Sequence, residues 1–169
     1  PFGIEKIVFV LGNDALHVDS NLNTTTSGTR QDVDGLWHQH FNAAKKAYIK
    51  AIEICRQFAD VKLIYNPSNH DWKSGKHLAD YISAWFRNDN HVEVTDAAFN
   101  MSHRKYLQYG DNLLGFTHGD GAKETDLPSL MQYEARKAWS NSRFAYWHLH
   151  HVHHKDTKNY GKYKKPVQT

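Results

Sequence analysis

Hydrophobic and polar positions along the chain predict strands and helices in alternation. Two apolar, largely β-branched runs of strand length occupy residues 4–11 and 61–65. Each is followed by a longer stretch in which large apolar residues recur every three or four positions, at 36–58 and at 74–87. This spacing predicts two amphipathic helices. A shorter stretch with the same spacing, 130–139, predicts a third helix.

Four further segments have the composition of strands. Residues 112–116 (NLLGF) and 143–147 (RFAYW) are apolar and aromatic runs. Residues 91–96 (HVEVTD) and 104–110 (RKYLQYG) are expected to form a hairpin-like pair beside 112–116. Strands that alternate with helices are typical of a layered α/β fold, which is the fold class that the sequence predicts.

Four of the apolar runs end in residues that commonly bind metal ions. They lead into Gly12-Asn13-Asp14, Asn69-His70-Asp71, His118-Gly119-Asp120 and the histidine-rich stretch 148–154. In open α/β sheets, ligands bind beyond the carboxyl ends of the strands. Any one of these clusters has a structural explanation, such as a helix N-cap. Because the pattern recurs after four runs, it favours a shared functional site.

The residue types in these clusters favour a divalent metal ion. Imidazole and carboxylate groups without thiolates suit zinc, manganese or iron better than a structural four-cysteine zinc site. His151 and His153 would lie on the same side of an extended segment, because strand side chains alternate. An aspartate at a strand end can bridge two cations, and paired ions about 3.5–4 Å apart are a recurrent arrangement for phosphoryl chemistry.

The order GND, NHD, HGD and then H-x-H resembles the calcineurin-like metallophosphoesterase family. That family carries Asp-x-His, Gly-Asp, Gly-Asn-His-Asp/Glu, a single His and Gly-His-x-His in succession. The resemblance extends from Ile7 to His154 and implies two facing β-sheets flanked by helices, with the metal centre at the strand ends. The spacing GNDALH is similar to that of the family's DNA-repair nucleases, and the loop after it resembles phage-encoded members.

The resemblance also implies a role for each matching residue. Five would be metal ligands: Asp14 as the bridging carboxylate, together with Asn69, His118, His151 and His153. The implied cofactors are divalent ions, Mn²⁺ or Zn²⁺ and alternatively iron, ideally two in each site.

Three residues would act on the substrate. His70 would face the scissile phosphate and assist the leaving group, Asp71 would orient His70, and His17 would lie near the substrate. The implied activity is hydrolysis of a phosphodiester by a metal-activated hydroxide. DNA or another nucleic acid is the favoured substrate, although one fold can serve many phosphoesters.

Departures from the family pattern change this expectation. Ser68 and His150 stand where the family has glycine, and a shifted closing pair, His148-x-His150, is an alternative. The Asp-x-His motif expected upstream of Gly12 is missing, so the chain is expected to be a partial domain. One metal site would then be nearly complete, while the other would keep only two ligands, Asp14 and His153.

Net charge is unevenly distributed. The chain has 169 residues and a formal charge of +3, but residues 155–169 hold five lysines and one aspartate, a net +4 that leaves −1 on the remainder. With no repeat or low-complexity linker, the sequence predicts one domain over 1–154 and a basic segment over 155–169. Such a segment can bind phosphate-rich partners weakly, although a solvated terminus is the commoner explanation.

Composition excludes several other classes. Hydrophobic residues make up 40% of the chain, as in a folded globular protein. A single cysteine, Cys55, excludes an internal disulfide framework. No apolar run is long enough to cross a bilayer and no signal-peptide pattern is present, so we expect a cytoplasmic protein without membrane partners.

Two alternative functions remain open at this stage. One is a phosphomonoesterase or nucleotide phosphodiesterase on the same fold. The other is an inactive metal-binding fragment, which the missing Asp-x-His makes reasonable. A metallo-β-lactamase-like hydrolase is excluded because it needs His-x-His-x-Asp-His, which HVHHKD does not supply.

Overall fold

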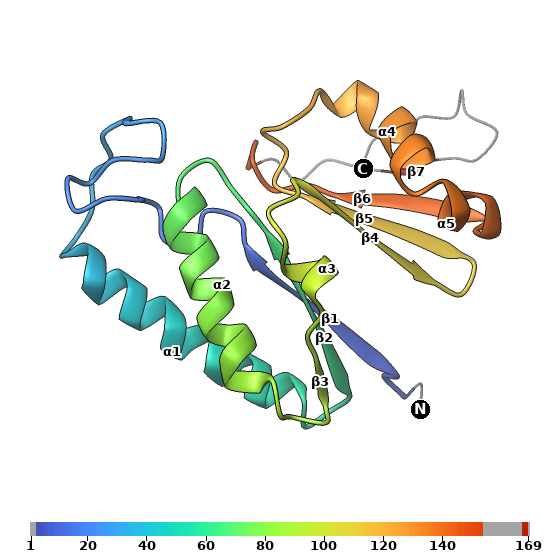
Figure 1. Ribbon diagram of the computed structural model, residues 1–169, viewed down its shortest axis with the longest axis horizontal. Helices are drawn as coiled ribbons and strands as arrows, with labels where there is room; N and C mark the ends of the chain where they lie inside the picture. The colour runs from blue at the N-terminus through green and yellow to red at the C-terminus, as the bar shows by residue number, and fades with distance from the viewer. Residues whose placement is uncertain (1–2, 154–166, 169) are drawn as a thin grey trace. The chain divides into compact units, whose positions relative to one another are not determined.

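The computed structural model describes residues 3–153 and 167–168. It divides into two compact units, residues 1–101 and 102–169, each with its own β-sheet and helices (Figure 1). The α/β class predicted from the sequence is therefore confirmed. Most of the predicted basic segment lies outside the described residues.

The sheet of the first unit is parallel. It contains β1 (Lys6–Gly12), β2 (Asp60–Asn66) and the short β3 (Val92–Glu93), in the order β1-β2-β3. Gly12 pairs with Asn66, so β1 and β2 end at the same level. The polar residues that follow both strands therefore start from one edge of this sheet.

Two long helices connect these strands. α1 (Trp37–Cys55) and α2 (Trp72–Phe86) confirm the two predicted amphipathic stretches and lie along one side of the sheet (Figure 1). The Leu36 N–H donates to the Gln39 side chain at 2.8 Å, which satisfies one backbone donor where α1 begins. A single-turn helix, α3 (Asp96–Phe99), follows β3.

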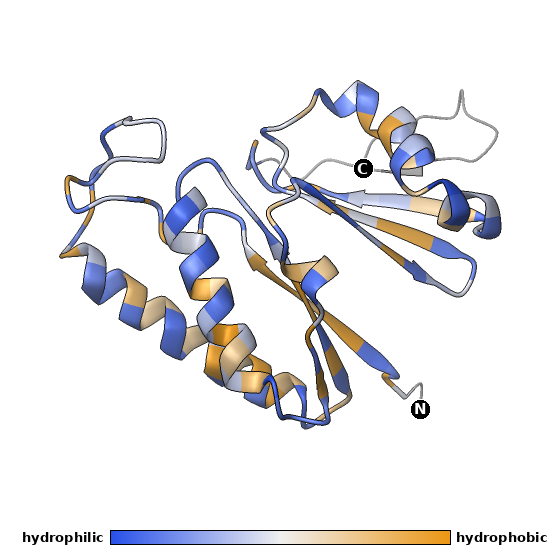
Figure 2. Ribbon diagram, viewed as in Figure 1, coloured by the Kyte–Doolittle hydropathy of each residue, from blue (hydrophilic) through white to orange (hydrophobic). Residues whose placement is uncertain are grey.

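Apolar side chains of the sheet and of both helices form the core of this unit. Ile52, Leu63 and Ile82 are fully buried, and Figure 2 shows apolar residues along β1, β2 and the helices beside them. Burying one such side chain contributes about 1.5–3 kcal/mol.

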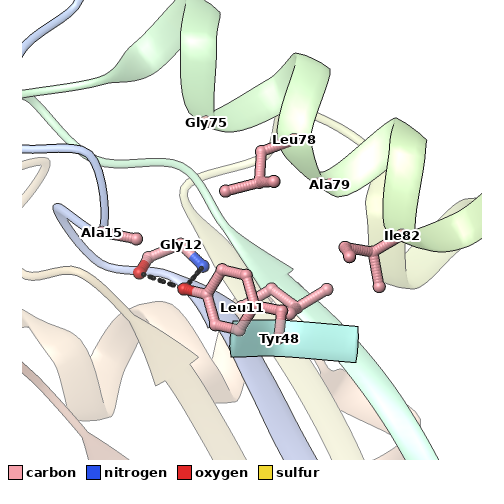
Figure 3. Close-up of a pocket in the computed structure, with 8 residues that line it drawn as sticks. All are labelled: Leu11, Gly12, Ala15, Tyr48, Gly75, Leu78, Ala79 and Ile82. Carbon is pink, nitrogen blue, oxygen red and sulfur yellow. Dashed lines mark hydrogen bonds between the residues drawn. The ribbon is translucent and has the colours of Figure 1, made fainter. Parts of the chain in front are cut away.

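Tyr48 connects this core to the end of β1. Its hydroxyl accepts from the Gly12 N–H at 3.3 Å and donates to the Gly12 carbonyl at 3.4 Å (Figure 3). Burial raises the pKa of Tyr48 to about 12, so the phenol remains a neutral donor at physiological pH. α1 thus holds the backbone at the point where β1 ends.

The second unit has a mixed four-stranded sheet. Its order is β4 (Arg104–Tyr109), β5 (Asn112–Thr117), β6 (Phe144–His148) and β7 (Val167–Gln168). β4 and β5 are antiparallel, whereas β5, β6 and β7 run parallel. Gly110 permits the tight β4–β5 turn with φ of +53°.

The predicted pairing of residues 91–96 with 104–110 is wrong. Within 91–96 only Val92 and Glu93 form a strand, and they pair in parallel with β2 in the first unit. Thr95 instead caps α3, because its hydroxyl accepts from the Ala98 N–H at 3.3 Å. A helix cap therefore forms within residues 91–96, although their composition is typical of a strand.

The helical region of the second unit is broken where one helix was predicted. After the 3₁₀ turn η1 (Glu124–Asp126), α4 (Leu127–Glu134) and α5 (Arg136–Asn141) are separated by Ala135, whose φ of −106° and ψ of 37° are not helical. The buried core of this unit consists of Leu113, Leu127, Met131, Ala145 and Trp147.

Gly115 of β5 is required by this core. A Cβ at Gly115 would lie 2.6 Å from the Trp147 ring and 2.7 Å from the Met131 methyl group.

In the part of the chain that the structure describes, no helix is long and apolar enough to cross a membrane.

Candidate metal centre

The loop after β1 adopts an unusual backbone conformation. Gly12, Asn13 and Asp14 have consecutive φ angles of 92°, 59° and 64°, and His17 has 63°. Left-handed conformations are uncommon for residues with a side chain, and they cluster at functional sites. A Cβ at Gly12 would lie 2.0 Å from the Asn66 carbonyl oxygen, so only glycine fits there.

Hydrogen bonds hold this loop against the loop after β2. The Asp14 N–H donates to the Ser68 hydroxyl at 2.8 Å, and the Asp14 carboxylate accepts from the His70 N–H at 3.1 Å. Ser68 does not have a positive φ angle, so this position does not require glycine. Its hydroxyl makes a contact that glycine could not make.

Asp71 is a buried structural anchor. Its carboxylate accepts from the Ser68 hydroxyl at 2.6 Å and from the Leu16 N–H at 2.9 Å, and the residue has no exposed surface. Burial, with the nearby Asp14 charge, raises the pKa of Asp71 above its ordinary value, although both hydrogen bonds oppose the shift. Asp71 therefore joins the two loops.

Asp71 was expected to orient His70, but the His17 backbone carbonyl contacts the His70 ring instead. His70 Nδ1 lies 3.0 Å from the His17 carbonyl oxygen, to which it must donate because a carbonyl only accepts. His70 Nε2 is then the nitrogen left for proton transfer in the neutral ring. The His17 and His70 rings are adjacent, with centroids 5.2 Å apart.

Buried amides lie at the same strand ends. Asn66 is fully buried, and neither its Oδ1 nor its Nδ2 has a hydrogen-bond partner within the described chain. The same holds for Asn13 Oδ1. Buried polar atoms are normally satisfied, so this edge is suited to a polar ligand, an ion or ordered water. Asn69, half-buried, lies in the same loop as Asp14's partner Ser68.

In the second unit, two histidines converge at the ends of β5 and β6. The His118 carbonyl accepts from the His150 N–H at 3.0 Å and from the His151 N–H at 2.9 Å. His118 is buried, with 1% of its surface exposed. This backbone arrangement brings His118 Nε2 within 3.1 Å of His151 Nδ1.

The nitrogen–nitrogen distance has a clear chemical meaning. Two imidazole nitrogens bound about 2.05 Å from one tetrahedral zinc ion would be about 3.3 Å apart. The observed 3.1 Å is close to that value, and a hydrogen bond between neutral rings gives the same separation. The separation is therefore compatible with ligation of one metal ion by both imidazoles.

The other closing histidines differ from this pair. His153 is exposed, has φ of 52°, and in the described chain makes no ring contact with His118 or His151. His148 stacks on Phe116 at 5.2 Å. Burial lowers the pKa of His148, and it also lowers the pKa of His150, to which the nearby His118 and His148 charges add.

The site residues thus form two groups, one in each unit. Asp14, His17, Asn69, His70 and Asp71 belong to the first unit, and His118, His151 and His153 to the second. Sequence patterns singled out Ser68 only as a departure from glycine and did not single out Asn66, whose burial without a hydrogen-bond partner is visible only in the structure. No protein-family model, curated protein or solved structure matches the chain.

Proposed function

We propose that the protein is a divalent-metal-dependent phosphoesterase of the calcineurin-like type that hydrolyses phosphodiester bonds of DNA or another nucleic acid. The observation that carries the proposal is the 3.1 Å approach of His118 Nε2 to His151 Nδ1 at two strand ends. This separation is compatible with ligation of one divalent ion by both imidazole nitrogens. The left-handed backbone at Asp14 supports the same conclusion from the first unit.

In this proposal Asp14, Asn69, His118 and His151 hold a Mn²⁺ or Zn²⁺ ion, and Asp14 with His153 contributes to a second. The nitrogen and oxygen donors, without thiolate, match the preferences of these ions. A bound divalent ion supplies Lewis acidity, which lowers the pKa of water and offsets charge on phosphate oxygens.

His70 is the proposed proton donor to the leaving oxygen. The His17 carbonyl fixes its Nδ1–H, which settles the tautomer and orients the ring. Nε2 can then carry the proton that the leaving group takes when His70 is protonated. General acid catalysis of this kind contributes about 10²–10⁴-fold to a rate.

The test compares metal content with hydrolysis. The protein would be loaded with Mn²⁺ or Zn²⁺, dialysed, and assayed on single-stranded DNA and on bis(p-nitrophenyl) phosphate. We expect His70→Ala to keep its metal and lose about 10²-fold or more in rate. His91→Ala is the matched control, because His91 is an exposed histidine whose ring contacts Asp60.

The outcomes separate the proposal from its alternatives. Full activity in His70→Ala, or no hydrolysis by metal-loaded wild type, would refute it. Metal binding without hydrolysis would favour an inactive metal-binding protein. Faster turnover of p-nitrophenyl phosphate than of either diester would favour a phosphomonoesterase.

A further inference from the structure

An open pocket of about 440 Å³ lies in the first unit, outside the groups described above. It is lined by the loop residues 19–21, by Trp37 at the start of α1, and by Lys73, Ser74 and His77 in the first turns of α2. Its walls therefore combine one large aromatic ring with two side chains that can carry positive charge.

The aromatic wall is held in place. The Trp37 indole N–H donates to the Ser74 hydroxyl at 3.2 Å, and that hydroxyl donates to the Asp19 carboxylate at 2.6 Å. The Trp37 ring also packs on Phe41, with centroids 5.3 Å apart. An indole fixed at its polar edge and supported by a neighbouring ring is a rigid surface for stacking.

The only carboxylate in the lining is occupied by the protein itself. Asp19 accepts from the backbone N–H groups of Lys73 and Ser74, at 3.1 and 2.7 Å, and from the Thr26 hydroxyl at 2.8 Å. Neither Lys73 nor His77 forms an ion pair with any described residue. These side chains remain available to an anionic ligand.

The pocket is next to the proposed proton donor. Lys73 follows His70 by three residues, so their Cα atoms are at most about 11 Å apart. Asp19 follows His17 by two residues, and His17 holds His70. A ligand in the pocket would therefore lie within a nucleotide or two of a phosphate at His70.

We infer that this pocket binds a nucleotide beside the scissile phosphate, with the base stacked on Trp37 and a flanking phosphate near Lys73 and His77. The inference rests on the proposed function and narrows its substrate to single-stranded nucleic acid. Stacking of bases on aromatic side chains beside a basic groove is the usual mode of binding single strands. A duplex keeps its bases stacked on one another and would not fill the pocket.

The experiment measures binding and hydrolysis separately. Fluorescence anisotropy in EDTA would give the affinity for a labelled oligothymidylate and for the same backbone without bases. We expect Trp37→Leu to weaken oligothymidylate binding by about five- to a hundred-fold, as for loss of one base stack. Lys73→Gln should lower the slope of log K against log salt by about 0.7.

Trp85→Leu is the matched control, because Trp85 is an exposed tryptophan of α2 that stacks on Tyr81 outside the pocket. Binding by Trp37→Leu equal to wild type, equal affinity for the backbone without bases, or an equal loss in Trp85→Leu would each overturn the inference. If Trp37→Leu fails to fold, Trp37→Phe should keep most of the affinity, and the Lys73→Gln slope decides.

Hydrolysis of bis(p-nitrophenyl) phosphate, which has no base, reports on the proposed function alone. Trp85→Leu, the control outside the pocket, should hydrolyse it within about twofold of wild type. If the wild-type protein does not hydrolyse this diester but binds oligothymidylate through Trp37, the phosphoesterase proposal is refuted and the nucleotide-binding inference is supported. If it hydrolyses the diester but its DNA binding does not depend on Trp37, the nucleotide-binding inference is refuted and the phosphoesterase proposal is supported.

Discussion

Asp19 is the residue through which the loop after β1 is fastened to α2. Burial alone would raise the pKa of Asp19, but hydrogen bonds from Ser74, Lys73 and Thr26 outweigh burial and hold the pKa below its ordinary 3.8. These donors include two backbone N–H groups of the first turn of α2, which an intrahelical bond cannot satisfy. The ionised carboxylate therefore caps a helix from a distant part of the chain.

We predict that Asp19→Asn lowers the free energy of unfolding by about 1–3 kcal/mol at pH 7, because a charged acceptor is replaced by a neutral one. A pKa lowered by folding contributes stability above 3.8, and this contribution is lost as pH falls through the folded value. The deficit of the variant should therefore shrink below about pH 4. Urea unfolding at pH 7, 5 and 3 would measure it.

The matched control for that measurement is Asp34→Asn. Asp34 lies in the same loop, is exposed, and forms no hydrogen bond with a described residue. Its substitution should change the free energy of unfolding by less than about 0.5 kcal/mol at every pH. A deficit in Asp19→Asn that stays constant from pH 7 to pH 3 would contradict the electrostatic account.

Residue types alone indicated where this site would be but not how its parts are joined. Asp14, Asn69 and His70 were candidates because they follow apolar runs, and Asp14 does contact Ser68 and His70 of the second loop. The partners could not be foreseen, because a hydrogen bond between loops over 50 residues apart leaves no local signal. The family resemblance implied that Asp71 would orient His70, whereas its carboxylate accepts from Ser68 and Leu16.

At the scale of elements, the close approach of β1 and β2 at their carboxyl ends shapes the site. Gly12 and Gly28 both have φ near +90°, yet a Cβ at Gly12 would lie 2.0 Å from the Asn66 carbonyl, while one at Gly28 would meet nothing within 4 Å. The two glycines therefore have nearly equal positive φ angles and differ in what an added Cβ would contact. Comparing alanine substitutions at the two positions therefore measures the energetic cost of crowding where β1 approaches β2.

We predict that Gly12→Ala destabilises the protein by about 1–3 kcal/mol more than Gly28→Ala, because overpacking against fixed backbone adds to the shared cost of positive φ. Equilibrium denaturation of both variants gives the difference directly. Equal losses in the two variants would mean that the ends of β1 and β2 can separate without cost.

Strong periodicity made the long helices predictable, and apolar composition predicted strands β2, β4, β5 and β6, whereas the regions 91–96 and 130–139 were predicted incorrectly. α1 and α2 lie almost where their apolar spacing placed them. The predicted helix 130–139 is interrupted at Ala135, whose backbone is not helical although alanine favours helix. Residues 91–96 had a strand composition but contain a helix cap.

At the scale of the whole molecule, the chain divides into two compact units, which no sequence pattern predicted. Each unit has a core of its own, and the proposed ligands are distributed over both. One domain over 1–154 was predicted because the chain has no repeat or low-complexity linker, and a sequence pattern contains no information on where contacts become sparse. Only the contacts within each unit reveal that division.

Metal binding should therefore affect both units if the proposed ligand set is correct. A ligand at about 100 times its Kd stabilises the native state by about 2.7 kcal/mol. We predict that saturating Mn²⁺ or Zn²⁺ slows amide hydrogen exchange in residues 6–99 and in residues 104–153. Asp14→Asn and His151→Ala should each abolish the effect in both ranges, whereas His91→Ala should leave it unchanged. Slower exchange in 104–153 alone, unaffected by Asp14→Asn, would show that His118 and His151 bind metal without ligands from the first unit. That result would contradict the proposed ligand set.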